Sequence, residues 1–316
     1  MQIQYINDYK YVNNKKKLTK KIILFFIILI ILAVISGFCY IAYLGVKSLS
    51  KKSVVVKENK QLFIDKNYTK LIEDMNKQLL KKPFNSEYLT LRGYSYFFLA
   101  EDESDISKKK TFLTLSLIDL RRVLAITKVN KIDNSILFIL GKIYYYLGEP
   151  YYYQSIDFLK KSYNRGNNRT DLLYLLGLIY SFTGEYNESI KVFQNALKIE
   201  ESEILLLALA NAYYKANDIK NAEIFLGNIL KNSKDNRIVE KSYYILGEIY
   251  FQQNELEKAL ENFNKAIEIN YSNAGAYFYR GEIYFKSNNL VKARAEWRKT
   301  LEIEPSHIKA LKRIYN

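Results

Sequence analysis

Two glutamates occupy the same place in a stretch that occurs twice in this chain. Residues 247–271 read GEIYFQQNELEKALENFNKAIEINY and residues 281–305 read GEIYFKSNNLVKARAEWRKTLEIEP, so Glu248 and Glu282 recur 34 residues apart. A pair of carboxylates can act as acid and base in glycoside hydrolysis. Because the whole stretch is repeated, and not only the glutamates, repeated surface charge explains the pair better than catalysis does.

No other residues indicate catalytic chemistry. The single histidine, His307, follows Pro305 by two positions, and we expect it on the surface of a terminal helix. The sequence contains no phosphate-binding glycine-rich loop, zinc-protease helix or nucleophile elbow. The single cysteine, Cys39, excludes an intramolecular disulfide and a cysteine-based metal site. We therefore expect a protein that is not an enzyme, with no catalytic residue, no cofactor and no metal.

Composition favours an α-rich protein that does not bind nucleic acid. Of 316 residues, 49% are hydrophobic, with 29 Tyr and 17 Phe but only 12 Gly and 3 Pro, so helix breakers are few. The net charge is +15, yet residues 1–60 hold eleven Lys against Asp8 and Glu58 and so supply most of it. The remaining residues have an ordinary surface charge, and we expect no nucleic-acid partner.

An apolar run near the N-terminus predicts a transmembrane helix. Residues 22–45, IILFFIILIILAVISGFCYIAYLG, contain no charged side chain. As a helix they would span about 36 Å, more than the roughly 30 Å hydrocarbon core of a bilayer. The run is longer than the apolar part of a cleaved signal peptide, so we interpret it as a signal anchor. A lipoprotein cut before Cys39 is the alternative, but Phe38 stands where such a site needs a small residue.

The lysines on the two sides of this helix predict its orientation. Six precede it within residues 10–21 and five follow it within residues 47–60. We expect the N-terminal tail in the cytoplasm and the bulk of the chain outside it, as a single-pass membrane protein. Ala33 and Gly37 form a small-xxx-small pair that could pack two such helices into a homo-oligomer.

From about residue 60, apolar residues recur at helical spacing between short polar breaks such as QQNE, KSNN and KAND. A period near 34 residues is typical of a solenoid. Small residues such as Gly247 and Ala259 would let two helices approach closely, while Tyr250 and Phe263 would fill the space beside the crossing. One unit cannot bury its own apolar face, so the repetition itself builds the core.

The order of these residues resembles the tetratricopeptide repeat family. Its pattern of a large residue, Leu-Gly or Leu-Ala, Tyr, Ala, an aromatic, Ala and Pro is matched best by Tyr243, Leu246, Gly247, Tyr250, Ala259, Phe263 and Ala266. The last unit matches with Tyr277, Gly281, Tyr284, Ala293, Trp297 and Pro305. Four earlier units keep the phase, the first of them starting near Leu89, and a degenerate seventh ends near Pro83. About eleven extra residues around EDESDISKKK in the Leu89 unit are expected to form an exposed loop.

The resemblance implies an all-α fold: an N-terminal transmembrane helix followed by a right-handed solenoid of about six to seven helix-turn-helix repeats. The expected organisation is a basic tail (1–21), a transmembrane helix (22–45), a juxtamembrane linker (46–59), the solenoid (60–305) and a C-terminal capping helix (306–316).

In the family, the first helix of each repeat lines a concave groove, and the side chains that face the groove stand at about positions 2, 5, 9, 12 and 13 of the unit. Here those positions are rich in aromatic residues, which either contact a partner or pack against neighbouring first helices. The groove candidates are Tyr94, Phe97, Phe138, Tyr145, Tyr174, Tyr214, Tyr244, Phe251, Phe278 and Phe285.

Some members of the family bind C-terminal carboxylates through Lys and Asn residues on three successive repeats. Asn211 alone matches such a position, so we expect a broader mode of peptide binding. The resulting hypothesis is a membrane-anchored scaffold that captures protein or peptide partners in an aromatic groove and organises the cell envelope. The alternative is a permanent subunit of an envelope or secretion complex that uses its convex face.

Overall fold

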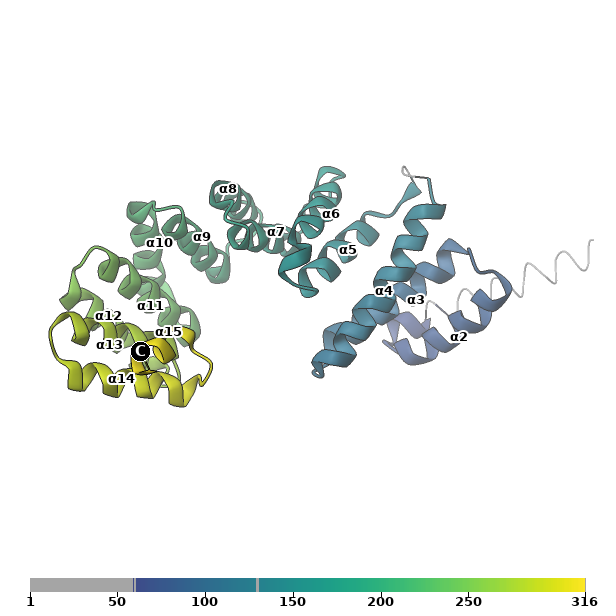
Figure 1. Cartoon of the computed structure of the whole chain (residues 1–316). Helices are drawn as coiled ribbons and strands as arrows, with labels where there is room; N and C mark the ends of the chain where they lie inside the picture. Colours follow the sequence, from purple (N-terminus) through teal and green to yellow (C-terminus); the bar gives the residue numbers. More distant parts are fainter. Residues whose placement is uncertain (1–58, 60, 129–130, 316) are drawn as a thin grey trace, which may run out of the picture. The chain divides into compact units, whose positions relative to one another are not determined.

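The structure is a computed structural model that describes residue 59, residues 61–128 and residues 131–315. Within this part of the chain every regular element is a helix (Figure 1). The expected transmembrane helix 22–45 and the tail 1–21 lie outside the described residues, as does the linker 46–59 except for Asn59. Of the helices that the structure does describe, none has both the length and the apolar character required to cross a bilayer.

The chain divides into two compact units between Lys77 and Gln78. In the described part of the first unit, residues 61–64 are helical and the helix α2 (Tyr68–Lys81) begins. This helix falls in the stretch where the sequence predicts the second helix of a degenerate repeat. The boundaries expected for the solenoid and its cap stay predictions.

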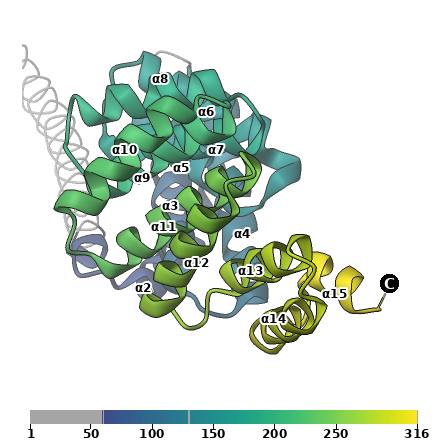
Figure 2. The same ribbon diagram turned by 90° about the vertical axis from the view of Figure 1, so that its left-hand side faces the viewer.

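The second unit is a succession of helix pairs, which gives an all-α repeat solenoid. Within each pair the two helices pack against each other, and each pair also packs against the next (Figures 1 and 2). The pairs are α3 (Ser86–Asp102) with α4 (Ile106–Ile126), α5 (Asn134–Tyr146) with α6 (Tyr152–Asn164), α7 (Thr170–Phe182) with α8 (Tyr186–Leu197), α9 (Glu203–Lys215) with α10 (Ile219–Asn232), α11 (Asn236–Gln252) with α12 (Leu256–Ile269), and α13 (Ala274–Lys286) with α14 (Leu290–Ile303). A short 3₁₀ helix, η2 (Glu149–Tyr151), precedes α6, and α15 (Ile308–Tyr315) follows α14.

Glycine lets the two helices of a pair approach closely. A Cβ atom on Gly247 would lie 2.6 Å from the ring of Phe263, and one on Gly281 would lie 2.6 Å from the indole of Trp297. Both large side chains are almost fully buried, and so is Ala259. The predicted combination of small residues at the crossing and an aromatic beside it is therefore confirmed for these pairs.

Three pairs add a hydrogen bond that the sequence analysis missed. Ser116, Ser155 and Ser189 stand where the repeat pattern has Ala, and each hydroxyl donates to the carbonyl oxygen of the crossing glycine of its partner helix. The Oγ–O distances are 2.7 Å for Ser116 to Gly93, 2.6 Å for Ser155 to Gly141 and 2.8 Å for Ser189 to Gly177. Serine can therefore replace alanine at this crossing position, because its buried hydroxyl finds a hydrogen-bond acceptor.

The polar breaks turn the chain through left-handed backbone conformations. Asn217, Asn254 and Asn288 have φ values of 63°, 61° and 59°, and they belong to the segments KAND, QQNE and KSNN. Asparagine tolerates this conformation better than most residues with a Cβ. The predicted turns are therefore confirmed.

The expected loop around EDESDISKKK is wrong. Only residues 103–105 are non-helical, because α3 continues to Asp102 and α4 begins at Ile106. Asp105 caps α4, since its carboxylate accepts a hydrogen bond from the backbone N–H of Lys108 at 2.8 Å. With an N-cap present and no Gly or Pro in the SKKK segment, the extra residues lengthen the helix instead of looping out.

The apolar core continues from pair to pair. One cluster of buried side chains extends from Phe138 on α5 to Ile249 on α11. The first helices of successive pairs, α3, α5, α7, α9, α11 and α13, also contact one another in order. They therefore form a continuous face, and this face positions the candidate site.

Candidate functional site

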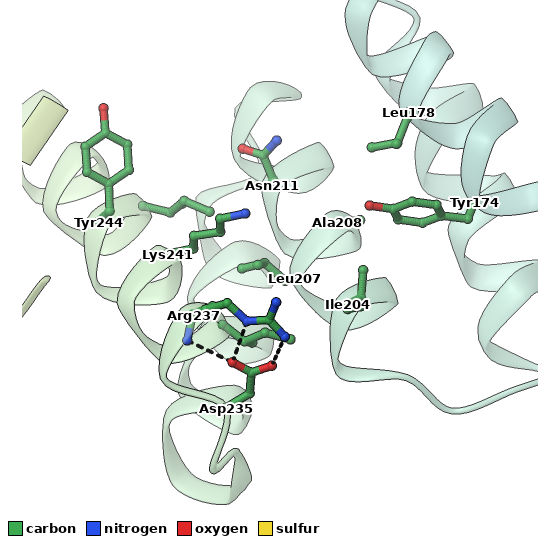
Figure 3. A pocket seen from close by; sticks show the side chains of 12 residues that line it. Tyr174, Leu178, Ile204, Leu207, Ala208, Asn211, Asp235, Arg237, Lys241 and Tyr244 are labelled. Atoms are coloured by element: carbon green, nitrogen blue, oxygen red, sulfur yellow. Dashed lines mark hydrogen bonds and ion pairs between the residues drawn. The ribbon is translucent and has the colours of Figure 1, made fainter. Parts of the chain in front are cut away.

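The first helices of three successive repeats, α7, α9 and α11, line a cavity of about 510 Å³ (Figure 3). Tyr174 and Tyr244 come from opposite sides, and α9 supplies Ile204 and Leu207 between them. Ile204 is 53% exposed, so an apolar side chain faces the open cavity. The full lining is Tyr174, Leu178, Ile204, Leu207, Ala208, Asn211, Asp235, Arg237, Ile238, Lys241, Tyr244 and Ile245.

A few polar groups interrupt this apolar lining. Asp235 caps α11 and accepts hydrogen bonds from Arg237, at 2.9 Å from its backbone N–H and 3.0 Å from its guanidinium. These bonds from Arg237 lower the pKa of the Asp235 carboxyl. The ammonium of Lys241 forms no ion pair with any residue in the described ranges. The amide of Asn211 lies between the two tyrosines as a donor and an acceptor (Figure 3).

The cavity contains residues that the sequence analysis passed over. Ile204, Leu207 and Lys241 stand at the second and fifth positions of their units, which are groove positions in the family, but they are not aromatic. The signal that could have found them was position in the repeat, independent of residue type. Of the ten groove candidates, Tyr174 and Tyr244 line this cavity.

Beside this cavity lies Glu248, a carboxylate near several tyrosines. The hydroxyl of Tyr244 donates to the Glu248 carboxylate at 3.3 Å. Burial raises the pKa of Tyr244 and of Tyr279, and the negative charge of Glu248 raises both pKa values further. Tyr214 is affected in the same way, and its hydroxyl also accepts a 2.7 Å hydrogen bond from the Gln252 amide. The charge of Glu248 therefore raises the pKa of three phenols on this face, and one of them, Tyr244, donates to it.

A second cavity, of about 650 Å³, lies between α11, α13 and the C-terminal helix α15. Phe251 and Phe278, both groove candidates, line it together with Glu282 and Arg313. Arg313 donates two hydrogen bonds to the Glu282 carboxylate, at 2.8 and 2.6 Å. Glu248 and Glu282 therefore have different partners and line different cavities, which gives no support to an acid-base pair.

Four of the groove candidates are buried in the structure. Phe97, Phe138, Tyr214 and Phe278 are at most 6% exposed, so their rings pack inside the solenoid. The ammonium of Lys142 lies 5.1 Å from the ring centre of Phe97 and 5.8 Å from that of Phe138, and it pairs with Glu101. On this part of the face, the chain itself covers the aromatic rings.

The remaining candidates are partly or largely accessible. Tyr94, Tyr145 and Phe251 are half-buried, whereas Phe285 is 43% exposed. The ring of Tyr145 stacks on Tyr152, at 6.2 Å between centroids. Whether any of the ten touches a ligand stays a prediction.

The contacts of His307 are structural. Its Nδ1 accepts a hydrogen bond from the backbone N–H of Ala310 at 3.2 Å, and its ring lies 5.0 Å from that of Phe278. These contacts fix the start of α15. Across residues 61–128 and 131–315, no three His, Cys, Asp or Glu side chains come together in a way that could hold a metal ion.

Comparison with protein families identifies the repeat. Models described as TPR repeat and tetratricopeptide repeat match residues 170–203, 247–288 and 274–307. The first match covers α7 and α8 and the last covers α13 and α14. The chain therefore contains tetratricopeptide repeats, units that are typical of non-catalytic protein-binding scaffolds.

Solved structures support the same fold across more of the chain. The C-terminal part of a TPR repeat-containing protein from Cytophaga hutchinsonii is 20% identical, with a TM-score of 0.57 over 82% of this chain and 99% of the other. A tetratricopeptide repeat protein from Parabacteroides merdae is 15% identical, with a TM-score of 0.57 over 82% and 95%. At these identities the likeness concerns the fold alone.

One curated protein is similar in sequence over a shorter stretch. The human protein O-mannosyl-transferase TMTC1 is 31% identical over 103 residues, which are 32% of this chain and 11% of that protein. Because the match spans so small a part of TMTC1, it says nothing about the activity of this chain.

Proposed function

We propose that this chain is a membrane-anchored scaffold that captures a protein or peptide partner on the face formed by its first helices. The observation that carries the proposal is the open, largely apolar cavity that crosses α7, α9 and α11. A cavity of about 510 Å³ is within the size range of sites that take up side chains or small ligands.

The lining suits an extended or helical peptide. Tyr174 and Tyr244 offer rigid apolar area at low entropy cost, and Asn211 can hydrogen-bond to a peptide backbone between them. Ile204 and Leu207 supply the apolar floor for a partner side chain. The described residues thus provide an apolar centre with polar groups at its edge, as in many protein interfaces.

The membrane anchor is a further part of the proposal. The uncharged run 22–45, with six lysines before it, supports a single-pass anchor with a cytoplasmic tail and the repeats outside the cytoplasm. Confinement to a membrane would raise the effective concentration of the scaffold near envelope partners. The Ala33 and Gly37 pair would allow self-association of the anchor.

The alternative is a permanent assembly subunit that binds through its second helices. Ile118 on α4, Ile224 on α10 and Val291 on α14 are exposed and favour such contacts. They lie on three separate helices, and singly exposed apolar side chains are common on ordinary surfaces. The cavity is therefore the better-supported binding site.

In-cell photo-crosslinking of the full-length chain tests the proposal. A photoreactive residue replaces Lys241, which is exposed and lines the cavity, and Ile204→Glu is then introduced in the same chain. We expect one discrete adduct that falls at least tenfold in Ile204→Glu, because a buried unpaired charge costs about 2–3 kcal/mol or more.

Ile224→Glu is the matched control, since Ile224 is 56% exposed on a second helix and Ile204 is 53% exposed on a first helix. It should leave the adduct unchanged. No adduct at position 241, or loss of partner only in Ile224→Glu, would reject capture in the cavity and favour the assembly subunit.

A further inference from the structure

The last two repeats provide an internal comparison of one site in two states. Positions 34 residues apart are equivalent in them: Glu248 with Glu282, Phe251 with Phe285, Phe263 with Trp297 and Tyr279 with Arg313. The register extends into α15, because Ala276 and Ala310 are equivalent and both are fully buried. The helix α15 therefore packs against α14 as α13 packs against α12.

In the last repeat, a cation of the chain itself fills the site. The guanidinium of Arg313 forms two hydrogen bonds with Glu282. It also lies 5.0 Å from the ring centre of Phe285 and 5.6 Å from that of Trp297. A carboxylate and two aromatic rings thus hold one guanidinium through charge-assisted hydrogen bonds and cation–π contacts.

In the preceding repeat, neutral phenols take the place of that cation. The ring of Tyr279 stacks on Phe263 at 5.3 Å between centroids and contacts Phe251 edge-on at 5.3 Å. The Tyr244 hydroxyl donates to Glu248 at 3.3 Å. Within the described ranges, Glu248 forms no ion pair. Its charge is hydrogen-bonded but not neutralised.

Glu248 also borders open space. Together with Tyr244, Phe278 and Tyr279 it lines a cavity of about 300 Å³. Glu304 adds a second carboxylate to the lining, and Lys309 adds one ammonium. Lys286, on α13, lies on the Phe251 ring and donates to Asn254 at 3.1 Å instead of pairing with Glu248. The lining therefore combines the aromatic rings of Tyr244, Phe278 and Tyr279 with two carboxylates against one ammonium, and His307, Gly275, Ser306 and Ile308 complete it.

We propose that this cavity binds an arginine or lysine side chain of the partner, so that the partner segment carries a basic residue and an apolar one on the same face. Tyr244 lines both this cavity and the 510 Å³ cavity, so two side chains from one face of the same peptide, such as residues i and i+2 of an extended segment, can enter the two. The inference rests on the proposed function, because it specifies the ligand of the same face. Arginine fits best, since Glu282, the carboxylate at the equivalent position of the next repeat, already holds a guanidinium through two hydrogen bonds.

The proposal is tested by fluorescence anisotropy with the full-length protein in detergent micelles. The probes are three fluorescein-labelled peptides, Gly-Leu-Gly-X-Gly-Gly-amide, in which X is arginine, its neutral isostere citrulline, or glutamate. We expect the arginine peptide to bind at least about tenfold more tightly than the citrulline peptide, because hydrogen bonds to charged groups contribute about 1.5–3 kcal/mol.

Glu248→Gln should abolish this preference and leave citrulline binding unchanged. Glu261→Gln, which alters an exposed carboxylate on α12, should keep the preference. Thermal unfolding of each variant checks that it is folded. Equal affinity for arginine and citrulline, a preference that survives Glu248→Gln, tightest binding of the glutamate peptide, or no binding of any peptide would each overturn the proposal.

This result can be separated from failure of the proposed function. If the adduct at position 241 forms and is lost in Ile204→Glu, but the peptides show no preference for arginine, capture in the groove stands and basic-residue recognition falls. If no adduct forms, capture in the groove falls as well.

Discussion

The α11–α12 repeat and the α13–α14 repeat are built from similar sequences, but their groove glutamates have different partners. Both use a glycine against a buried ring, and both have a glutamate at the same position of the first helix. In the α13–α14 repeat, α15 brings Arg313 to Glu282, whereas in the α11–α12 repeat the next first helix brings Tyr279 to Glu248. The difference shows that the neighbouring unit, and not the repeat itself, decides whether a groove carboxylate is neutralised.

The largest expected effect is on the free energy of unfolding, and it concerns the crossing glycine that the two repeats share. Gly247→Ala and Gly281→Ala should each destabilise the fold by about 1–3 kcal/mol, because the new Cβ would overlap a buried ring. Chemical unfolding of each variant measures this. If the two losses differ by more than the error, the repeats do not share one packing rule.

Gly227→Ala is the control, since a Cβ on Gly227 in α10 would meet no atom within 4 Å. A helical glycine replaced by alanine in open space should stabilise by about 0.5–1 kcal/mol. Destabilisation of this variant to the same extent would show that the glycine effects are not steric.

Arg313→Ala should have a smaller effect on stability, but it directly tests the difference between the partners of Glu248 and Glu282. The pair with Glu282 is partly exposed, with 42% of the Arg313 side chain accessible, so the loss should be about 1 kcal/mol or less. Removal of the guanidinium should also make the Glu282 site available, so that the arginine peptide binds at two sites instead of one. Titration calorimetry measures the stoichiometry, and an unchanged value would contradict the equivalence of the two sites.

The smallest effect concerns tyrosine ionisation around Glu248. Because the carboxylate raises the pKa of Tyr244 and Tyr279 in addition to burial, Glu248→Gln should lower both pKa values. NMR titration of ring-labelled tyrosine follows them. If neither pKa changes, the charge of Glu248 does not influence the ionisation of Tyr244 and Tyr279.

The same shifts predict how stability depends on pH. An unfolded tyrosine has a pKa of about 10, and the folded pKa values are higher. The folded state therefore keeps the tyrosine hydroxyl protons up to a higher pH than the unfolded state does. The stability that they contribute is fully present below about pH 10 and is lost as the pH rises through the folded values. Glu248→Gln should reduce this alkaline loss.

The repeat itself could be predicted because it rests on local pattern. The phase of Gly247, Ala259 and Phe263 predicted which residues cross and which fill the space, and the structure confirms it. The loop expected around EDESDISKKK was wrong, because comparison with a fixed repeat length treats any excess as a loop. The cap at Asp105 instead extends α4.

The candidate site was only partly predictable. Tyr174 and Tyr244 line the 510 Å³ cavity, whereas Phe97, Phe138, Tyr214 and Phe278 are buried although they stand at groove positions of their own repeats. The difference arises from the neighbours of each ring, such as Lys142 above Phe97, and these lie far away in sequence. The position of a residue in the repeat predicts which way its side chain points, but not whether other side chains bury it.

The amino-acid sequence by itself determined the helical repeat, its phase and its turns, because helical periodicity, crossing glycines and left-handed asparagines act within one unit or between adjacent ones. Only the tertiary structure decided which groove positions stay open. Glu248 already has Tyr244 on its own helix, but whether it also meets a second phenol, and whether Glu282 meets a guanidinium, depends on side chains 31 residues further along the chain, brought there by the packing of the next helix. Burial and charge pairing are properties of that packing, and no single repeat contains them.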